Sequence, residues 1–162
     1  MTTGVNAPER AIYHEWIDKF KGYLKNGDSV LDIGCFPRHD YHSTMREFKY
    51  QTIDPNTEHH PDIVGEIGLE SHYSPYDGLM CHGVHSECIN PFSLTVGAIK
   101  CLKSGGIGLL GVVLLGYPPY QGEKWRFTEA GVNSLLEGLE ILDKRIVHRE
   151  QPSFWFGIVR KP

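Results

Sequence analysis

Residues able to accept a proton gather in one short stretch in the middle of the chain. His82, His85 and Glu87 follow closely after the apolar run Tyr76–Cys81. A histidine titrates near neutral pH, so either histidine could act as a general base or line a polar site, and an ionised glutamate can do the same. The alternative is a loop whose histidines only cap the next helix. His85 and His82 are therefore the first candidates for catalytic residues, with Glu87 as the third.

Two aspartates stand in or at the end of apolar runs. The run Ser29–Pro37 (SVLDIGCFP) carries Asp32 and turns at Gly34, where glycine allows backbone geometry that a side chain would forbid. The run Tyr50–Ile53 is followed by Asp54. The distance along the chain from Asp32 to Asp54 is close to the roughly 20 residues at which an acidic residue meets ribose hydroxyls in dinucleotide folds. A carboxylate can accept hydrogen bonds from both hydroxyls. The alternative is that Asp54 begins an ordinary turn with the proline and asparagine after it.

A later loop carries aromatic residues that could line a substrate. Gly116–Arg126 (GYPPYQGEKWR) is about a dozen residues long, and loops of that length are often functional. Tyr117 and Tyr120 offer flat walls for a ring or a sugar face, and Arg126 can pair with an acidic group. Trp125 is a fourth candidate, although it could instead pin the start of the following helix. These four residues are the candidate substrate-binding set.

Periodicity and turn residues predict the elements that must position these side chains. Strands alternate with helices, as in an open parallel sheet whose ligands bind beyond the carboxyl ends of the strands. The expected elements are a helix capped by Asn6 and running through Lys25, a strand ending at Ile33, a helix over His39–Lys49, a strand over Tyr50–Ile53, a very short strand within Asp62–Ile67, a strand over Tyr76–Cys81, a helix from Asn90 to Leu102, a strand over Ile107–Leu115, a helix capped by Thr128, and strands over Leu139–His148 and Phe154–Val159.

Length and charge narrow the class of protein. With 162 residues the chain is sized for one domain, 1–162, with a loose amino-terminal end at residues 1–6. The net charge of -4 lacks the basic footprint that grips a nucleic-acid backbone, so we do not expect a nucleic-acid partner. No apolar run is long enough to span a bilayer, so no membrane partner is expected.

The cysteines and the absence of certain motifs further narrow the class of protein. Four cysteines without a CxxC pair, and no amino-terminal segment of signal-peptide type, predict a reduced, cytoplasmic protein. His59 and His60 have no carboxylate or cysteine at a recognised ligand spacing, so we predict a solvated loop there and no metal. The absence of GxGxxG and of GxxxxGK[ST] argues against nicotinamide and P-loop nucleotide binding.

The segment VLDIGC resembles motif I of the class I S-adenosylmethionine-dependent methyltransferases, in which a hydrophobic strand runs into an acidic residue and a glycine turn. The loop after it departs from the family, because Phe36 and Pro37 stand where further glycines are usual. KSGG before the fifth strand and WRFTEAG before the last helix also look like this family, and the resemblance covers essentially the whole chain. It implies an α/β, Rossmann-like, seven-stranded, mostly parallel sheet with an antiparallel last strand and helices on both faces.

The resemblance also implies a cofactor and an activity. S-adenosyl-L-methionine is the expected cofactor, and the residues expected to bind it are Asp32, Gly34, Cys35, Phe36, Asp54, Glu66, Ile67 and Cys81. The expected reaction is methyl transfer to a small-molecule or saccharide acceptor. A binding module with a degenerate active site is the alternative, and aminopropyl transfer on the same fold is a third possibility.

Overall fold

The computed structural model describes residues 7–35, 41–148 and 151–162, and the end at residues 1–6, including the expected cap Asn6, lies outside them. The elements in chain order are α1 (Ala7–Lys21), β1 (Ser29–Ile33), β2 (Lys49–Asp54), the 3-10 helix η1 (Thr57–His59), β3 (Ile63–Val64), β4 (Tyr76–His82), the 3-10 helix η2 (Val84–Ser86), α2 (Pro91–Cys101), β5 (Leu102–Val113), α3 (Glu129–Leu135), β6 (Glu140–His148) and β7 (Pro152–Arg160).

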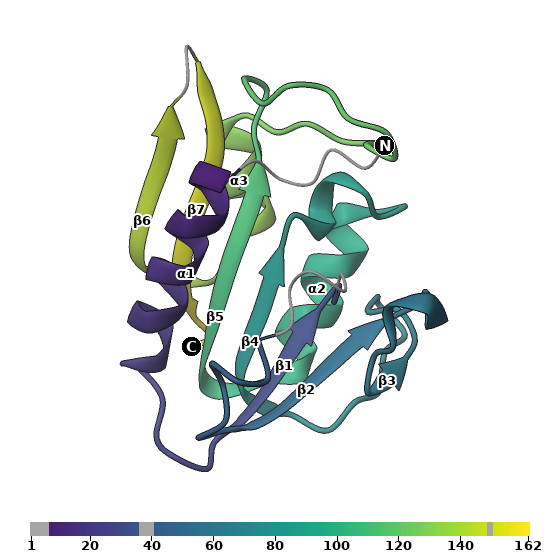
Figure 1. Ribbon diagram of the computed structural model, residues 1–162, viewed down its shortest axis with the longest axis vertical. Coiled ribbons are helices and arrows are strands. Elements are labelled where there is room, and N and C mark those ends of the chain that lie inside the picture. Colours follow the sequence, from purple (N-terminus) through teal and green to yellow (C-terminus); the bar gives the residue numbers. More distant parts are fainter. Residues whose placement is uncertain (1–6, 36–40, 149–150) are drawn as a thin grey trace.

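The seven strands form one sheet in the order β3-β2-β1-β4-β5-β7-β6 (Figure 1). Neighbouring strands from β3 to β5 run parallel, whereas β7 runs antiparallel to both β5 and β6. The prediction of a mostly parallel sheet with an antiparallel last strand is therefore confirmed. The chain moves outward from β1 to β3 and then returns to β4, so the strand order reverses between β1 and β4. Open α/β sheets bind their ligands at such a point.

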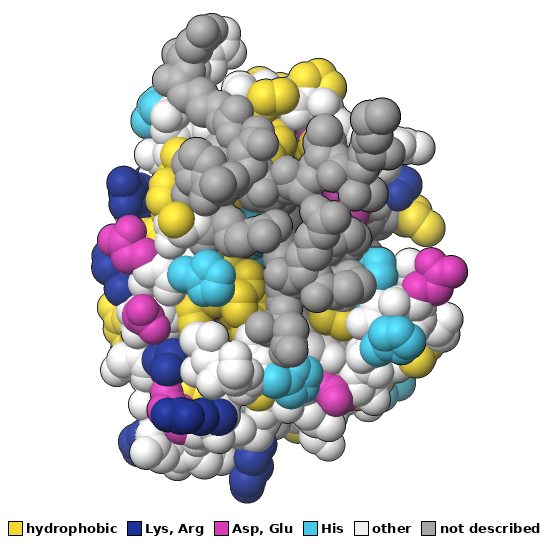
Figure 2. Space-filling model, viewed as in Figure 1, with side chains coloured by type: hydrophobic (Ala, Val, Ile, Leu, Met, Phe, Trp, Pro, Cys, Tyr) yellow, Lys and Arg dark blue, Asp and Glu magenta, His cyan; other side chains and the backbone are white. Residues whose placement is uncertain are grey.

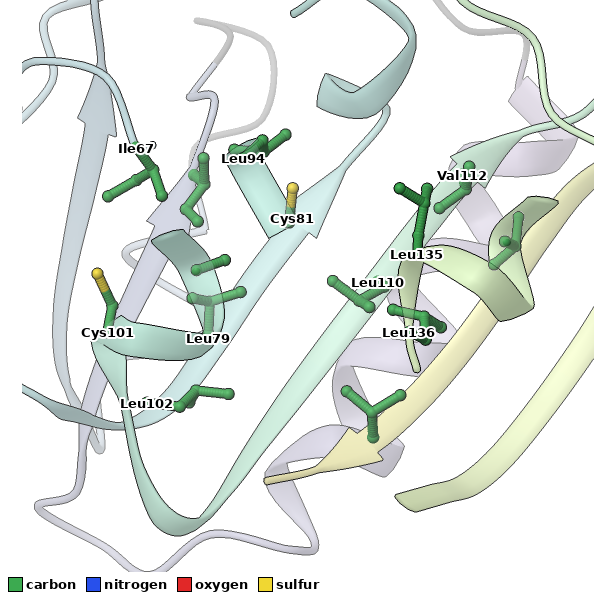
Figure 3. Packing of buried hydrophobic residues seen from close by; sticks show 14 of the residues in the cluster. Ile67, Leu79, Cys81, Leu94, Cys101, Leu102, Leu110, Val112, Leu135 and Leu136 are labelled. Carbon is green, nitrogen blue, oxygen red and sulfur yellow. The ribbon is translucent and has the colours of Figure 1, made fainter. Parts of the chain in front are cut away.

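Helices cover both faces of the sheet, as predicted, and each face has its own apolar core. On the α1 face, Tyr13 and Trp16 pack with Val30 of β1 and with residues of β5 and β7. On the α2/α3 face, the cluster shown in Figure 3 joins both helices to the other side of the same strands. Side chains alternate along a strand, so Leu31 and Ile33 point into this second cluster.

The capping residues predicted for two helices are present. The Asn90 side chain accepts hydrogen bonds from the backbone N–H groups of Phe92 and Ser93 at the start of α2. The Thr128 side chain accepts one from Gly131 at the start of α3. Because a cap satisfies backbone donors that the helix cannot, short polar residues at these positions were readable from the sequence.

The helix predicted over His39–Lys49 is wrong in its described part. Residues 42–47 form turns, while His39 and Asp40 lie outside the described residues. Buried Tyr41 and Met45 anchor this segment to the α1 face, and the backbone N–H groups of Met45 and Phe48 donate to the carbonyls of Tyr41 and Met45 at 2.8 and 2.9 Å. The N–H groups of Gly27 and Lys49 then bond to the carbonyls of Glu47 and Asp28, each at 2.8 Å, which ties the segment to the turn before β1. These tertiary bonds replace the helical ones.

Two element boundaries also differ from prediction. α1 ends at Lys21 rather than Lys25, and tight turns follow, such as the one joining Gly22 N to Lys19 O. β5 begins at Leu102, and the expected turn before Ile107 is an irregularity inside the strand, with Gly105 at φ +75°. Pairing with β4 is maintained on both sides of this irregularity, so the sheet absorbs the turn.

The four cysteines are free thiols. Among the described residues, no helix has both the length and the apolar character required to span a membrane.

Candidate active site

The turn at the end of β1 depends on a glycine. Gly34 has φ +84°, and a side chain there would place its Cβ 2.4 Å from Cγ2 of Val84. Its N–H donates to the carbonyl of Ile53 at the end of β2, at 2.9 Å. The turn thus holds together the ends of β1 and β2 and the segment after β4. Cys35 follows in a buried position that raises the pKa of its thiol, and Phe36 lies outside the described residues.

Asp32 is buried on the α1 side of the sheet, with 4% of its surface exposed. Burial raises the pKa of its carboxyl to about 7, against the opposing effects of the Tyr50 hydrogen bond and of nearby His42. The Tyr50 hydroxyl donates to Asp32 Oδ2 at 2.5 Å. Nearby, the buried Tyr13 hydroxyl makes no hydrogen bond within the described part of the chain. Asp32 is therefore a carboxyl that can be neutral or charged close to physiological pH.

Asp54 ends β2 at the same edge of the sheet and is 7% exposed. Its Oδ1 accepts the backbone N–H of Asn56 at 2.8 Å, and its Oδ2 lies 3.1 Å from Nδ1 of His59. Its backbone carbonyl accepts the N–H of Gly65 at 3.1 Å, which fixes the short strand β3 beside it. The predicted turn after Asp54 is present, and it orients the carboxylate.

The segment after β3 places Glu66 and Ile67 differently. Glu66 is exposed, whereas Ile67 is buried in the core of the α2/α3 face. Gly97 of α2 lies against the backbone of Gly68 so closely that a Cβ would come within 2.4 Å of its carbonyl oxygen. This close approach lets α2 position the segment, and sequence reasoning did not identify Gly97.

The two histidines after β4 lie on opposite faces of the sheet. His82 ends β4 on the α1 face, where its ring lies 3.9 Å from that of Tyr13 and stacks on Phe154 and Phe156. It is half-buried. His85 is 2% exposed and belongs to the interior beneath α2.

The hydrogen bonds of His85 are all used inside the protein. The Thr95 hydroxyl donates to the carbonyl of Pro91 at 2.8 Å, so it accepts from Nε2 of His85 at 3.1 Å. Nδ1 then faces the thiol of Cys81 at 3.7 Å. Burial lowers the pKa of His85 to about 4 and raises that of Cys81 well above its usual range. His85 is thus a neutral residue of the core, and this placement does not favour its role as a base.

Glu87 follows η2 at the surface of the protein. Partial burial raises the pKa of its carboxyl, while a hydrogen bond from Tyr120 and the nearby charge of Lys124 lower it. The charge of Asp54 raises this pKa further, and that of His59 lowers it. Glu87 thus remains a candidate base that solvent can reach.

The loop predicted to contact substrate is docked on the segment after β4. The backbone N–H groups of Lys124 and Trp125 donate to the carbonyl of Ser86 at 2.7 and 3.0 Å, and the Tyr120 hydroxyl is hydrogen-bonded to Ser86 Oγ at 2.6 Å. The indole of Trp125 donates to the carbonyl of Cys88 at 3.0 Å. Trp125 is 42% exposed, and this hydrogen bond attaches it to the segment after β4.

Arg126 is occupied by its own loop. Its Nε and Nη2 donate to Oε2 of Glu123 at 2.9 and 2.8 Å, and its Nη1 donates to the carbonyls of Leu115 and Tyr117. Tyr117 is buried and lies edge-on to both Phe154 and Tyr120. Tyr117 and Tyr120 therefore belong to the aromatic wall that includes His82, whereas Arg126 shapes the loop.

Comparison with known proteins adds information at the level of fold. No protein-family model matches the sequence, and no curated protein matches it. Among solved structures, N-methyltransferase NodS from Bradyrhizobium japonicum WM9 aligns with a TM-score of 0.74 and 16% identity, over 95% of this chain and 96% of that one. Coclaurine N-methyltransferase bound to N-methylheliamine and SAH aligns with a TM-score of 0.74 and 8% identity, over 99% of this chain and 74% of that one.

The cyclase SpnF is also similar, with a TM-score of 0.72 and 16% identity over 94% of this chain and 81% of that one. The chain thus has the Rossmann-like fold of the class I S-adenosylmethionine-dependent methyltransferases. Because proteins named for different reactions share this fold, the reaction has to be argued from the site.

Proposed function

We propose that the protein is an S-adenosylmethionine-dependent methyltransferase acting on a small-molecule or saccharide acceptor. The observation that carries the proposal is the meeting of three features where the strand order reverses. These are the Gly34 turn, the carboxylate of Asp54 and the segment after β4, and the Cβ position of Gly34 against Val84 ties the first to the third. The same fold in structures named as methyltransferases supports it.

The residues at this edge of the sheet fit an adenosine. Asp54 is a buried carboxylate whose two oxygens are oriented by Asn56 and His59, and it retains lone pairs for ribose hydroxyls. Glu66 and the backbone of Ile67 would stand beside the base, and Gly34 and Cys35 beside the amino-acid part. Asp32 and Cys81 are buried at the ends of β1 and β4, so we assign them a supporting role beneath the turn.

When bound, S-adenosylmethionine would supply an activated methyl group. The work left to the chain is to align the acceptor and to exclude water. The rings of Tyr13, His82 and Tyr117 line the α1 face and suit that task, because they present flat surfaces and pack against their neighbours. We propose Tyr117 and Tyr120 as the residues that meet the acceptor.

If the acceptor is a hydroxyl or an amine, its proton must leave. We propose Nε2 of His82 or the Glu87 carboxylate as its destination, because Nδ1 of His82 is buried against Gly111 of β5. His82 is half-buried at the end of β4, and partial burial raises the pKa of Glu87, which makes its carboxylate a better base. The two ring nitrogens of His85 already contact Thr95 and Cys81, so we do not propose it as the base.

Isothermal titration calorimetry tests the cofactor. The protein should bind S-adenosylmethionine and S-adenosylhomocysteine, and Asp54→Ala should weaken binding by roughly 1.5–3 kcal/mol, the scale of hydrogen bonds to a charged group. Glu58→Ala, which removes an exposed carboxylate nearby, is the matched control and should bind as the wild type does. Absence of binding at ligand concentrations up to about 1 mM would overturn the proposal at its root.

Incubation of metabolite and glycan extracts with methyl-labelled S-adenosylmethionine tests the reaction. A labelled small product would identify the acceptor. Label found only in RNA or protein would overturn the proposed class of acceptor, but it would still support S-adenosylmethionine as the cofactor. Cofactor binding without any labelling would favour a non-catalytic binding module, a reading consistent with the burial of His85.

A further inference from the structure

His59 lies between Asp54 and Asn56 in the turn at the end of β2. Its Nδ1 is shielded from water and lies 3.1 Å from Oδ2 of Asp54, although the direction departs from that of a linear hydrogen bond. Its Nε2 lies 3.1 Å from Nδ2 of Asn56. The backbone N–H of Asn56 donates in turn to Asp54 Oδ1 at 2.8 Å. Residues of one turn thus lie against both oxygens of the carboxylate.

The cap of η1 decides which way the Asn56 amide faces. Asn56 Oδ1 accepts the backbone N–H of Glu58 at 3.0 Å, as the cap of the 3-10 helix Thr57–His59. The opposite end of the amide, Nδ2, carries only donors, so it must donate to Nε2 of His59. A ring nitrogen that accepts a hydrogen bond carries no proton.

With Nε2 as the acceptor, the proton of this tautomer is on Nδ1. The assignment follows from the hydrogen-bond partners, because hydrogen positions themselves are inferred. The Nδ1–H group points toward the region of Asp54 Oδ2.

We infer that His59 is a positioning residue for Asp54, which holds the carboxylate in the orientation that receives ribose hydroxyls. The inference rests on the proposed function, since it concerns how the adenosine site is held. Asn56 N–H restrains one oxygen and His59 Nδ1–H the other, so the carboxylate cannot rotate away without breaking a contact at each oxygen. The lone pairs that remain are the ones a ribose can use.

A double-mutant cycle measured by calorimetry with S-adenosylhomocysteine tests this inference. His59→Ala should weaken binding roughly five- to tenfold, because the carboxylate loses the group that lies 3.1 Å from its Oδ2. In the Asp54→Ala background the same substitution should have no further effect, because its influence passes through the carboxylate. His59→Asn should restore at least half of the lost affinity on a logarithmic scale, since its amide N–H can take the place of Nδ1–H.

The neighbouring histidine provides the control. His60 is exposed and has φ +52°, a conformation that asparagine also tolerates, so His60→Asn should bind as the wild type does. No residue of η1 is buried, so the variants are expected to fold, and urea unfolding checks this.

Unchanged affinity in His59→Ala, an equal loss in the Asp54→Ala background, or failure of His59→Asn to restore binding would each overturn the inference. A wild-type protein that does not bind S-adenosylhomocysteine would overturn the proposed function instead.

Discussion

The two faces of the sheet treat their polar groups differently. On the α2/α3 face, His85 is hydrogen-bonded to Thr95 and faces the thiol of Cys81, although the indole N–H of Trp155 in the same core makes no hydrogen bond among the described residues. On the α1 face, Asp32 has a carboxyl whose pKa is raised to about 7, and the Tyr13 hydroxyl makes no hydrogen bond among the described residues.

A buried polar group normally has a hydrogen-bond partner, because burying it without a hydrogen bond costs free energy. A complete network is typical of a structural role, and an incomplete one is typical of a site that meets a ligand. The contrast is sharpest for His82 and His85, which are close in the sequence and lie on different faces. The different surroundings of these two histidines support the proposal that the chemistry takes place on the α1 face, at the carboxyl edge of the sheet.

The largest expected effect is a loss of stability when a buried side chain of a covering helix is removed. Within the described part of the chain α1 is the helix that packs on the α1 face, and Trp16 is fully buried beneath it. Trp16→Ala should lower the free energy of unfolding by about 3–5 kcal/mol through lost contacts and a cavity. Urea unfolding measures it.

Leu135→Ala removes a buried side chain of α3 and serves as the counterpart on the other face. Its loss of about 2–5 kcal/mol should leave the affinity of the folded protein for S-adenosylhomocysteine unchanged. A loss below about 1 kcal/mol in Trp16→Ala would show that the α1 face does not depend on α1.

The pH dependence of stability should separate the two faces. Asp32 has its pKa raised from 3.8 to about 7, so its contribution is present below pH 3.8 and lost as the pH rises through about 7. His85 has its pKa lowered from 6.5 to about 4, so its contribution is present above pH 6.5 and lost as the pH falls toward 4. Between pH 4 and 6.5 the two slopes oppose each other.

Asp32→Asn leaves the slope of His85, so its stability should rise with pH by about 2–4 kcal/mol across this window. His85→Leu leaves the slope of Asp32, so its stability should fall by a similar amount. Urea titrations at a series of pH values measure both. Two variants with the same pH profile as the wild type would refute the raised pKa of Asp32 and the lowered pKa of His85.

Two glycines with similar positive φ allow the contribution of the Gly34 turn to be tested by comparison. Gly34→Ala combines a φ of +84° with a Cβ placed 2.4 Å from Val84, whereas Gly27→Ala has a φ of +89° with nothing within 4 Å. We expect a loss of about 2–3 kcal/mol at Gly34 and about 1 kcal/mol at Gly27. Gly34→Ala should also weaken S-adenosylhomocysteine binding. Equal losses at both positions would mean that Val84 moves aside freely.

The smallest expected effect tests how the loop 116–126 is held. Tyr120→Phe removes the hydroxyl that bonds Ser86 Oγ at 2.6 Å and should cost about 0.5–1.5 kcal/mol in the free energy of unfolding. Trp125→Phe removes an indole hydrogen bond from a side chain that is 42% exposed, and should stay within about 0.5 kcal/mol of the wild type. The reverse order would show that the loop is held by Trp125 rather than by Tyr120.

The sequence by itself predicted most of the strands and helices in their order and proposed the place of the site. Strand patterns and the caps Asn90 and Thr128 act through neighbours a few residues away, so they can be read without the fold. Gly34 marks a turn in the sequence, but its contacts with Val84 and Ile53 appear only in the fold. The helix expected over His39–Lys49 failed because bonds to the turn before β1, far from local periodicity, decide that segment.

Only the tertiary structure decided what each candidate side chain does. Gly83, at φ +75°, turns the chain between His82 and His85 and sends them to different faces. Glu123 and two carbonyls engage Arg126, and the cap of η1 brings His59 to Asp54, although the sequence predicted a solvated loop there. Burial and hydrogen-bond partners arise from residues far apart in the chain, and residue type and spacing do not encode which of them meet.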